Sequence, residues 1–248
     1  MAIFKCIAFM GFIFCTHAFA SEERCLYLLL EGGASFSQKA KFYPPLPWDP
    51  TPQGYSNKLR NSEVLGAGIG YQFCPLLATE LKYNYRNSFK YKKFQSADTP
   101  FGDKIRFFNL KNTTAMADFL FYARGFTDCL SYVSEHFRMD PYVNVGMGLS
   151  YNRIENFHSV QVATGTVFSM MSPNTKTSFA YQLGLGLEVS TCDLLSVAFG
   201  YRFLDAGKFR SNSYIIDNPP SLTSGIVAPE WKARFRTNEI FVKLIFKI

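Results

Sequence analysis

The feature that most constrains the fold of this chain is the alternation in its last ten residues, EIFVKLIFKI at 239–248. Every second residue from 240 to 248 is apolar, whereas the positions between them include Glu239, Lys243 and Lys247. A β-strand puts successive side chains on opposite faces, so one face of this strand is apolar and the other carries charges. Such faces need two different solvents, which lipid outside and a polar interior would supply. The segment is therefore predicted to be a membrane-spanning strand.

The first twenty residues have the layout of a secretory signal peptide. An early lysine is followed by an apolar run over 6–15 and by the small-x-small cleavage motif AFA at 18–20. A permanent helical anchor is the weaker interpretation, because the run is short for a bilayer span and charged residues follow it at once. We expect a cleaved signal peptide at 1–20 and one mature domain at 21–248.

Composition and strand length separate a membrane barrel from a secreted soluble β-protein. Hydrophobic residues make up 48% of the chain, yet no apolar stretch after residue 20 is long enough for a membrane helix. A membrane protein of this kind has to be a barrel, since a barrel satisfies its backbone hydrogen bonds without water. The alternation over 78–91 is also more than twice as long as soluble strands of about 5 to 6 residues. Its apolar face holds Thr79, Leu81, Tyr83, Tyr85, Phe89 and Tyr91, and its polar face Glu80, Lys82, Asn84, Arg86, Ser88 and Lys90.

Eight such segments, separated by turn signals, indicate an all-β fold. Glycines on alternate positions, such as Gly66, Gly68 and Gly70, would leave room for side chains inside a narrow barrel. Short and long connections alternate, which predicts an eight-stranded antiparallel up-and-down transmembrane β-barrel with long extracellular loops and periplasmic termini. Ten strands remain an alternative if 160–171 add a hairpin arm. The predicted strands are 26–36, 64–73, 78–91, 106–123, 141–153, 177–189, 195–204 and 234–248, and the long connections are 37–63, 92–105, 154–176 and 205–233.

Five motifs carry a likeness to a known family: LGAGIGYQF at 65–73, PYVNVGMGLSY at 141–151, AYQLGLGLEV at 180–189, FGYRFLDAGK at 199–208 and the terminal strand. In their order and spacing they resemble the small outer-membrane β-barrel proteins of Gram-negative bacteria, of the opacity-protein, Ail/OmpX and OmpA transmembrane-domain type. The likeness covers nearly the whole mature chain. The resemblance implies contact with outer-membrane lipids, insertion by the outer-membrane assembly machinery and loops exposed at the cell surface. The chain departs from the pattern at Ile248, where these proteins usually end in Phe.

Charges on the inward faces of the predicted strands balance, with five acids and five bases. Lys111 belongs to this set, although the register of its strand is ambiguous. Charges removed from water persist only when they are paired, so this balance predicts a plug of ion pairs. A small porin-like channel is the alternative, but barrels of about eight strands are just filled by their side chains. The other members of the predicted network are Glu31, Glu80, Lys82, Arg86, Asp118, Glu188, Arg202, Glu239 and Lys243.

The long connections and the adjoining strand ends carry an excess of basic residues, and the sequence pI is about 9.0. These side chains could contact the phosphates of lipopolysaccharide, or they could simply be solvated cations at strand ends. Nucleic acid is not expected as a partner, because the charges are spread over strand ends of an exported chain. The predicted lipopolysaccharide contacts are Lys90, Lys92, Lys93, Arg210, Arg234 and Arg236.

Four cysteines remain after the predicted cleavage, all at the end of the barrel that would face the oxidising periplasm. Three pairings are possible. Cys25 begins the first predicted strand and Cys74 ends the second, which favours a Cys25–Cys74 disulfide and leaves Cys129 and Cys192 for each other. Free thiols are the alternative. Without a Cys-x-x-Cys motif or clustered histidines, we expect no metal and no other cofactor.

Some outer-membrane barrels are enzymes that modify lipid A, so catalysis has to be considered. His158, Ser159 and Glu155 could supply a base, a nucleophile and an orienting carboxylate. Adjacent strand residues point to opposite faces, however, so His158 and Ser159 would not meet. We expect a non-enzymatic surface protein that stabilises the membrane or contacts a host or neighbouring cell through its loops. An adhesive surface, or packing within the loops, could involve Phe42, Tyr43, Trp48, Tyr55, Phe168, Met170, Met171, Tyr214, Ile215 and Ile216.

Overall fold

The computed structural model describes most of residues 25–248. Trp48, Tyr55, Cys129, Cys192 and the predicted signal peptide lie outside the described residues. Within the described part, no helix is long and apolar enough to cross a membrane. The described residues are 25–40, 42–43, 59–95, 103–125, 131–134, 137–191, 194–217, 226–227 and 230–248.

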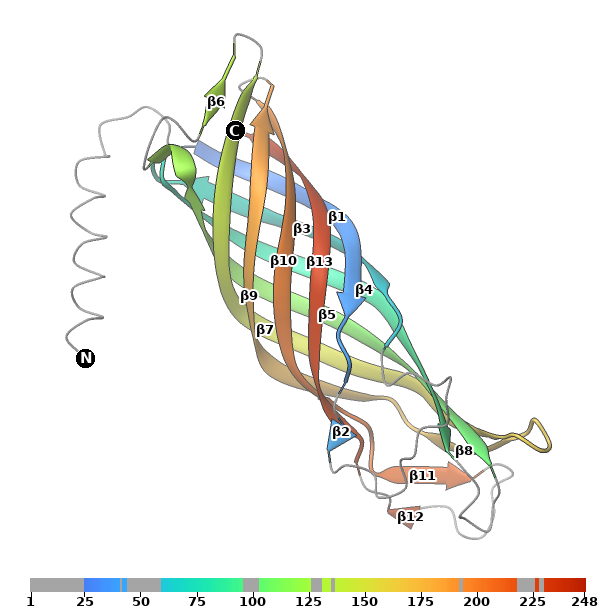
Figure 1. The fold of residues 1–248 in the computed structure, drawn as a ribbon. Coiled ribbons are helices and arrows are strands. Elements are labelled where there is room, and N and C mark those ends of the chain that lie inside the picture. The colour runs from blue at the N-terminus through green and yellow to red at the C-terminus, as the bar shows by residue number, and fades with distance from the viewer. Residues whose placement is uncertain are drawn as a thin grey trace.

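Eight long antiparallel strands form a closed ring (Figure 1). Each pairs with the next long strand along the chain, and the first and last pair with each other, so that Leu28 faces Phe246 and Leu30 faces Leu244. The predicted strands and their up-and-down order are confirmed. The strands are β1 (Cys25–Ser37), β3 (Ser62–Gln72), β4 (Leu77–Gln95), β5 (Lys104–Tyr122), β7 (Arg138–Gln161), β9 (Asn174–Ser190), β10 (Leu195–Arg210) and β13 (Lys232–Lys247).

Short elements lie at both ends of the ring. The residues 160–171 form the hairpin arm that the ten-strand alternative described, outside the ring of eight: β7 continues beyond the ring and β8 (Val167–Met171) folds back on it. At this end β11 (Tyr214–Asp217) pairs with β8 and β12 (Ile226–Val227) pairs with β11, while β2 (Phe42–Tyr43) pairs with β13. The other end holds η1 (Ala123–Gly125) and β6 (Tyr132–Val133). We call these ends the long-loop end and the short-turn end.

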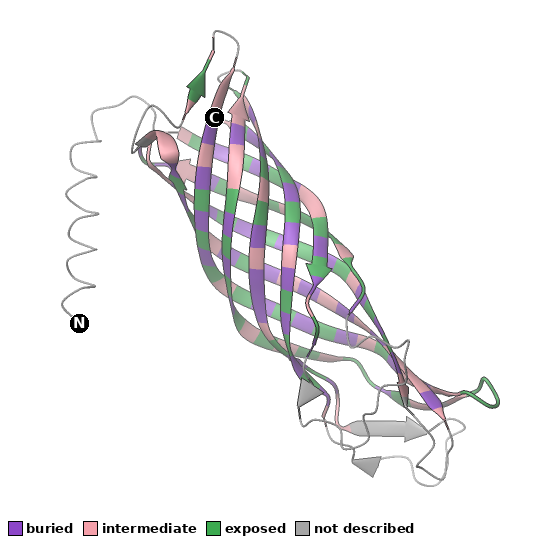
Figure 2. Ribbon diagram, in the orientation of Figure 1, coloured by how far each residue is buried: buried purple, intermediate pink, exposed green. Residues whose placement is uncertain are grey.

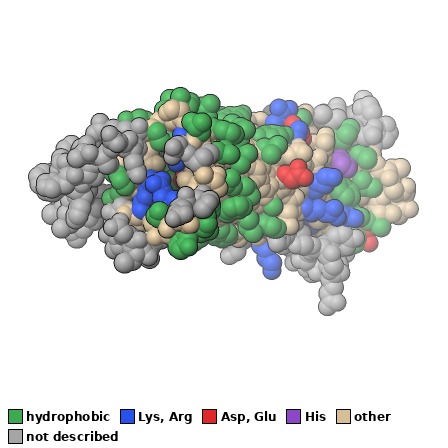
Figure 3. All heavy atoms as spheres, turned by 90° about the horizontal axis from the view of Figure 1, so that it is seen from above, with side chains coloured by type: hydrophobic (Ala, Val, Ile, Leu, Met, Phe, Trp, Pro, Cys, Tyr) green, Lys and Arg blue, Asp and Glu red, His purple; other side chains and the backbone are tan. Residues whose placement is uncertain are grey.

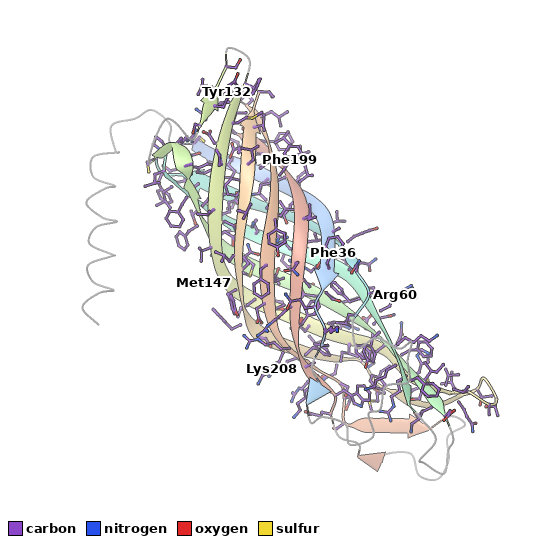
Figure 4. The ribbon with its side chains drawn as sticks, viewed as in Figure 1. Phe36, Arg60, Tyr132, Met147, Phe199 and Lys208 are labelled. Carbon is purple, nitrogen blue, oxygen red and sulfur yellow. The ribbon has the colours of Figure 1, made fainter. Side chains whose placement is uncertain are left out.

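Buried and exposed residues alternate along every long strand (Figure 2). The outward side chains in the middle of the barrel are hydrophobic and cover it as a belt (Figure 3). Phe36, Met147 and Phe199, from β1, β7 and β10, belong to this outer surface (Figure 4). Charged side chains lie inside the barrel or beyond the belt, as the two-solvent interpretation of the terminal strand predicts.

The alternation changes phase near the long-loop end, because several strands contain β-bulges. Between Arg86 and Phe89, β4 has one residue more than its partner β5, and β10 has one more than β13 between Asp205 and Lys208. One extra residue moves every following side chain to the other face. The prediction that Phe89 and Tyr91 share the outer face was therefore wrong, since both are buried inside, while Lys90 points outward.

Candidate functional site

The middle of the barrel interior holds a layer of buried charges. The structure places nine of the ten residues of the predicted network, all except Lys111, in buried positions, and Glu80, Arg86, Asp118, Arg202 and Glu239 have no exposed surface. Eight of these nine form ion pairs with one another, whereas Glu188 pairs with Lys247. We call these eight the ion-pair layer: Glu31, Glu80, Lys82, Arg86, Asp118, Arg202, Glu239 and Lys243.

Glu239 is the centre of one half of this layer. Arg202 Nε lies 2.6 Å from Glu239 Oε2, and Arg86 Nη2 donates to the same oxygen at 3.0 Å. The other carboxylate oxygen, Oε1, accepts from Arg86 Nε and from the hydroxyl of Ser35 at 2.7 Å. Arg86 also donates to Asn112 Oδ1 at 3.0 Å. Both guanidinium groups are thus compensated in charge, which buried ions require, and Arg86 also has a hydrogen-bond partner at each of its three nitrogens.

The second half of the layer joins two lysines to two acids. Lys243 Nζ lies 2.7 and 2.9 Å from the two carboxylate oxygens of Glu80, and Lys82 pairs with Asp118. Gln182 Nε2 donates to Asp118 at 2.6 Å. Glu31 contacts both Arg202 and Lys82, and so connects the two halves. The layer has four acids and four bases, all inside the ring.

Two residues that sequence assigned to the interior network, Lys111 and Glu188, do not belong to the ion-pair layer. Lys111 points outward, where it pairs with Glu155 at 2.8 Å, because its buried neighbours Leu110 and Asn112 occupy the inward positions of β5. Its assignment to the interior was wrong. Glu188 is buried, but it lies nearer the short-turn end, where it accepts from the hydroxyl of Tyr122 at 2.7 Å and faces Lys247.

Apolar side chains close the interior on both sides of the ion-pair layer. At the short-turn end, Tyr27, Leu29, Leu120, Tyr122 and Tyr142 form the core of a buried cluster. A larger group, which we call the aromatic cluster, fills the long-loop end. Sequence reasoning missed it, in part because bulges turn Phe89, Tyr91, Phe157 and Phe209 inward. The aromatic cluster contains Phe89, Tyr91, Phe108, Leu110, Ile154, Phe157, Phe209, Trp231 and Phe235.

Glycines in the ring leave the room that this filling needs. A Cβ added at Gly70 or Gly186 would meet the ring of Tyr27 or Tyr142, and one added at Gly146 would meet the carboxylate of Asp118. These glycines therefore face interior side chains, as their alternate spacing predicted. Small residues in the wall are what allow large side chains in a narrow barrel.

The predicted lipopolysaccharide contacts do not form one cluster. Lys90 and Lys92 are exposed on β4, whereas Arg210, Arg234 and Arg236 are exposed on β10 and β13, across the ring from β4. Lys93 is buried on the inner side, after the β4 bulge, so it cannot reach a lipid outside the barrel.

Each of the three arginines pairs with a carboxylate, and two of them share the same one. Arg234 Nε and Arg236 Nε lie 2.7 and 2.8 Å from Asp205 Oδ2, in the β10 bulge. Arg210 lies 3.6 Å from Glu230. Lys232 donates a hydrogen bond to Glu230 and lowers the pKa of that carboxyl. About half of each arginine side chain remains exposed, which leaves guanidinium donors available to an external anion.

A depression of about 1360 Å³ lies at the long-loop end, around the extended parts of β4, β5 and β7. Phe107 stacks on His158 with ring centroids 5.1 Å apart, and Lys92 Nζ lies 5.6 Å from the Phe107 ring. Lys90 and Met170 also line it. We call this the concave surface. It combines cations, aromatic rings and amide groups, the chemistry by which proteins hold anionic or polar partners.

The residues considered for catalysis are not brought together. Ser159 is buried, whereas His158 is partly exposed on the opposite face, where its Nδ1 lies 2.8 Å from the carbonyl oxygen of Asn156. Glu155 is engaged by Lys111 and Arg153, each at 2.8 Å. The base, the nucleophile and the orienting acid therefore do not form a triad.

Cys25 and Cys74 are not bonded to each other, so the predicted disulfide between them was wrong. Cys25 faces Gln72 across β1 and β3, which puts Cys74 two residues beyond it, in the turn after β3. An offset of two residues is about 7 Å along a strand, whereas a disulfide needs Cα atoms roughly 4.4–6.8 Å apart. Among the described residues, no group of His, Cys, Asp and Glu side chains is arranged to hold a metal ion.

Comparison with known proteins gives consistent similarities. A family model, outer membrane protein beta-barrel domain, matches residues 6–220. The outer membrane protein PagN of Salmonella typhimurium is 24% identical over 215 residues, which cover 84% of this chain and 85% of PagN. Neisserial surface protein A has 11% identity and a TM-score of 0.49 and covers 92% of this chain and 100% of its own. OprG of Pseudomonas aeruginosa has 13% identity and a TM-score of 0.47, with coverages of 90% and 96%.

Proposed function

Because the chain belongs to the outer membrane protein β-barrel domain family, we propose that it is a non-enzymatic surface protein of the Gram-negative outer membrane. In this proposal residues 1–20 are a cleaved signal peptide, and the assembly machinery inserts the domain at 21–248. The long-loop end faces the outside and the termini face the periplasm, because outer-membrane barrels have short periplasmic turns and longer extracellular loops.

The observation that carries the proposal is the filled interior. Within the described residues, an ion-pair layer lies between two apolar clusters, and all three consist of buried side chains. An ion crossing the barrel would have to separate buried ion pairs and enter apolar packing, both of which cost several kcal/mol. This filling supports a structural core over the porin-like channel.

Planar-bilayer recording of the refolded protein tests this conclusion. We expect no steady unit conductance from the wild-type protein, because three filled layers block the interior. A matched recording from a known porin, refolded in the same way, controls for insertion. Steady single-channel steps from the wild-type protein would contradict the proposal and favour the small pore.

The exposed arginines support a membrane-stabilising part of this role. In the proposed orientation, Arg210, Arg234 and Arg236 lie on the wall at the upper boundary of the belt, where lipopolysaccharide carries phosphates. Guanidinium forks suit phosphate oxygens, and Asp205 holds two of these side chains in place. Lys90 and Lys92 contribute on the opposite wall, and Lys93 takes no part, because it is buried.

The concave surface supports the adhesive part of the proposed role. Of the residues that sequence proposed for adhesion, Met170 and Met171 both line this surface; Met170 is exposed, whereas Met171 is buried in the same hydrophobic core as the aromatic cluster. Stacked Phe107 and His158, with Lys90 and Lys92 beside them, offer an apolar and cationic contact to an anionic ligand on a host or neighbouring cell.

Charge reversal tests the adhesive surface. Cells that display the Lys90→Glu/Lys92→Glu variant should bind cultured host cells several-fold less than cells that display the wild-type protein, because the surface loses its attraction for anions. Lys208→Glu is the matched control, as Lys208 is an exposed lysine of β10, on the far side of the ring. Equal loss of binding in both variants would show that net charge, and not this surface, is responsible.

A further inference from the structure

One row of outward residues crosses four strands at the concave surface. Lys92 of β4 pairs with Phe107 of β5, and Phe107 pairs with His158 of β7. His158 in turn pairs with Met170 of β8. All four residues line the depression. The Phe107 ring stacks on the imidazole with an angle of 17° between the two planes, so His158 is held within the row of residues that an anionic ligand would meet.

A bulge in β7 fixes the imidazole of His158. Between Glu155 and His158, β7 has one residue more than β5. Asn156 lies in this bulge with a φ of 54°, a left-handed conformation that asparagine adopts more readily than most residues. Its carbonyl oxygen lies 2.8 Å from His158 Nδ1. A carbonyl oxygen only accepts hydrogen bonds, so Nδ1 carries a proton and donates it to this bond. The other ring nitrogen, Nε2, is therefore an acceptor in the neutral imidazole and a donor in the protonated one.

The charged groups around this imidazole are basic. Among the described residues that line the concave surface, the charged ones are Arg60, Lys90 and Lys92, and none is an acid. Tyr91, which also contributes to the lining, is buried on the inner side of β4, and the lining residues of β5 and β8 carry no charge. Glu155 precedes the bulge on β7 and is engaged by two bases of the outer wall. An anion at this surface therefore meets three cations and one ring whose charge depends on pH.

We propose that His158 makes anion binding at the concave surface pH-sensitive, with tighter binding at acid pH. Histidine is the side chain that ordinarily changes its charge between about pH 8 and pH 5. Protonation turns Nε2 from an acceptor, which repels an anionic oxygen, into a charged donor that binds one. The stacked Phe107 ring attracts the imidazolium, so the side chain keeps its position in both states. This inference rests on the proposed function, in which the surface binds an anionic ligand of a host or neighbouring cell.

Binding of dextran sulfate to the full mature protein tests this proposal, with uncharged dextran as the control for contacts that do not involve charge. Sulfate groups keep their charge between about pH 7.5 and pH 5.5, so a change in affinity over this range, in which histidine titrates, comes from the protein. We expect the affinity of the wild-type protein to rise on the order of tenfold at the lower pH, the effect of one charge-assisted hydrogen bond. His158→Gln should lose this rise. His136→Gln, which changes the other histidine of residues 21–248, is the matched control and should keep it.

Each other outcome overturns the proposal. Equal affinity of the wild-type protein at both pH values would remove the pH dependence and leave the adhesive surface in place. An undiminished rise in His158→Gln would assign the effect to another group, and loss of the rise in His136→Gln would assign it to that histidine. No binding of dextran sulfate at either pH would instead contradict the adhesive part of the proposed function, and this inference with it.

The tautomer of His158 gives a second measurement that does not need the His158→Gln variant to refold. Nitrogen NMR spectra of the His136→Gln variant, labelled in its histidine, should show Nδ1 protonated and Nε2 unprotonated at neutral pH, because Nδ1 donates to the carbonyl oxygen of Asn156. The opposite tautomer would show that Nε2 is not the acceptor that protonation converts.

Discussion

Glu239→Gln is expected to lower the free energy of unfolding by about 3–5 kcal/mol, because it leaves two buried guanidinium groups without their shared counter-ion. Arg86 and Arg202 both contact this carboxylate, and none of the three side chains has exposed surface. The amide keeps the shape of the side chain, so the effect comes from charge and not from a cavity. Reversible urea unfolding of the protein in lipid bilayers measures it.

Glu155→Gln is the control for this substitution. Glu155 also contacts two bases, Lys111 and Arg153, but these side chains are exposed at the outer surface. Exposed ion pairs contribute about 0–1 kcal/mol, so this variant should unfold nearly as the wild type does. If the two variants have equal stability, the ion-pair layer is not the compensated buried network that the geometry describes.

Phe108→Ala is expected to cost about 3–5 kcal/mol, since it removes the central ring of the aromatic cluster and leaves a cavity. The Phe108 ring stacks on Tyr91 at 4.5 Å and on Phe157 at 5.7 Å, and it also contacts Phe209. The loss should concentrate at the long-loop end. Amide hydrogen exchange should therefore accelerate in the extended parts of β4, β5 and β7, while the strands within the belt keep their protection.

Phe107→Ala is the control for this substitution, because it removes a phenylalanine ring without removing packing from the aromatic cluster. Phe107 is the adjacent residue of β5 but points outward, where it contacts His158 and Lys92. Its removal should cost much less stability and should instead weaken binding by the concave surface. Equal destabilisation by the two substitutions would mean that the aromatic cluster does not hold the long-loop end together.

Much of the interior could be predicted once the strands were recognised. Arg202 and Glu239 are direct neighbours across β10 and β13, so alternation and strand order together place them side by side. The contact between Arg86 and Glu239 could not be predicted in this way. β1 and β3 separate their strands, and the two side chains meet only because the ring closes and they reach across its interior.

The sequence by itself determined the eight strands, their order and, in the middle of the barrel, which side chains face inward and which form the belt, because a period of two in a two-solvent environment admits one assignment. Beyond the belt, only the tertiary structure decided which side chains face inward. Bulges at 86–89 and 205–208 move the following side chains to the opposite face of the strand. Phe89, Tyr91 and Phe209 are therefore buried inside the barrel, where they fill its long-loop end, and Lys90 points outward. A bulge adds a residue without breaking the alternation of residue types, so no local pattern announces it. The closing strand at 232–247 illustrates both contributions. Its alternation in the sequence predicted the barrel, whereas the ion pair between Glu239 and Arg86 depended on how the ring closed.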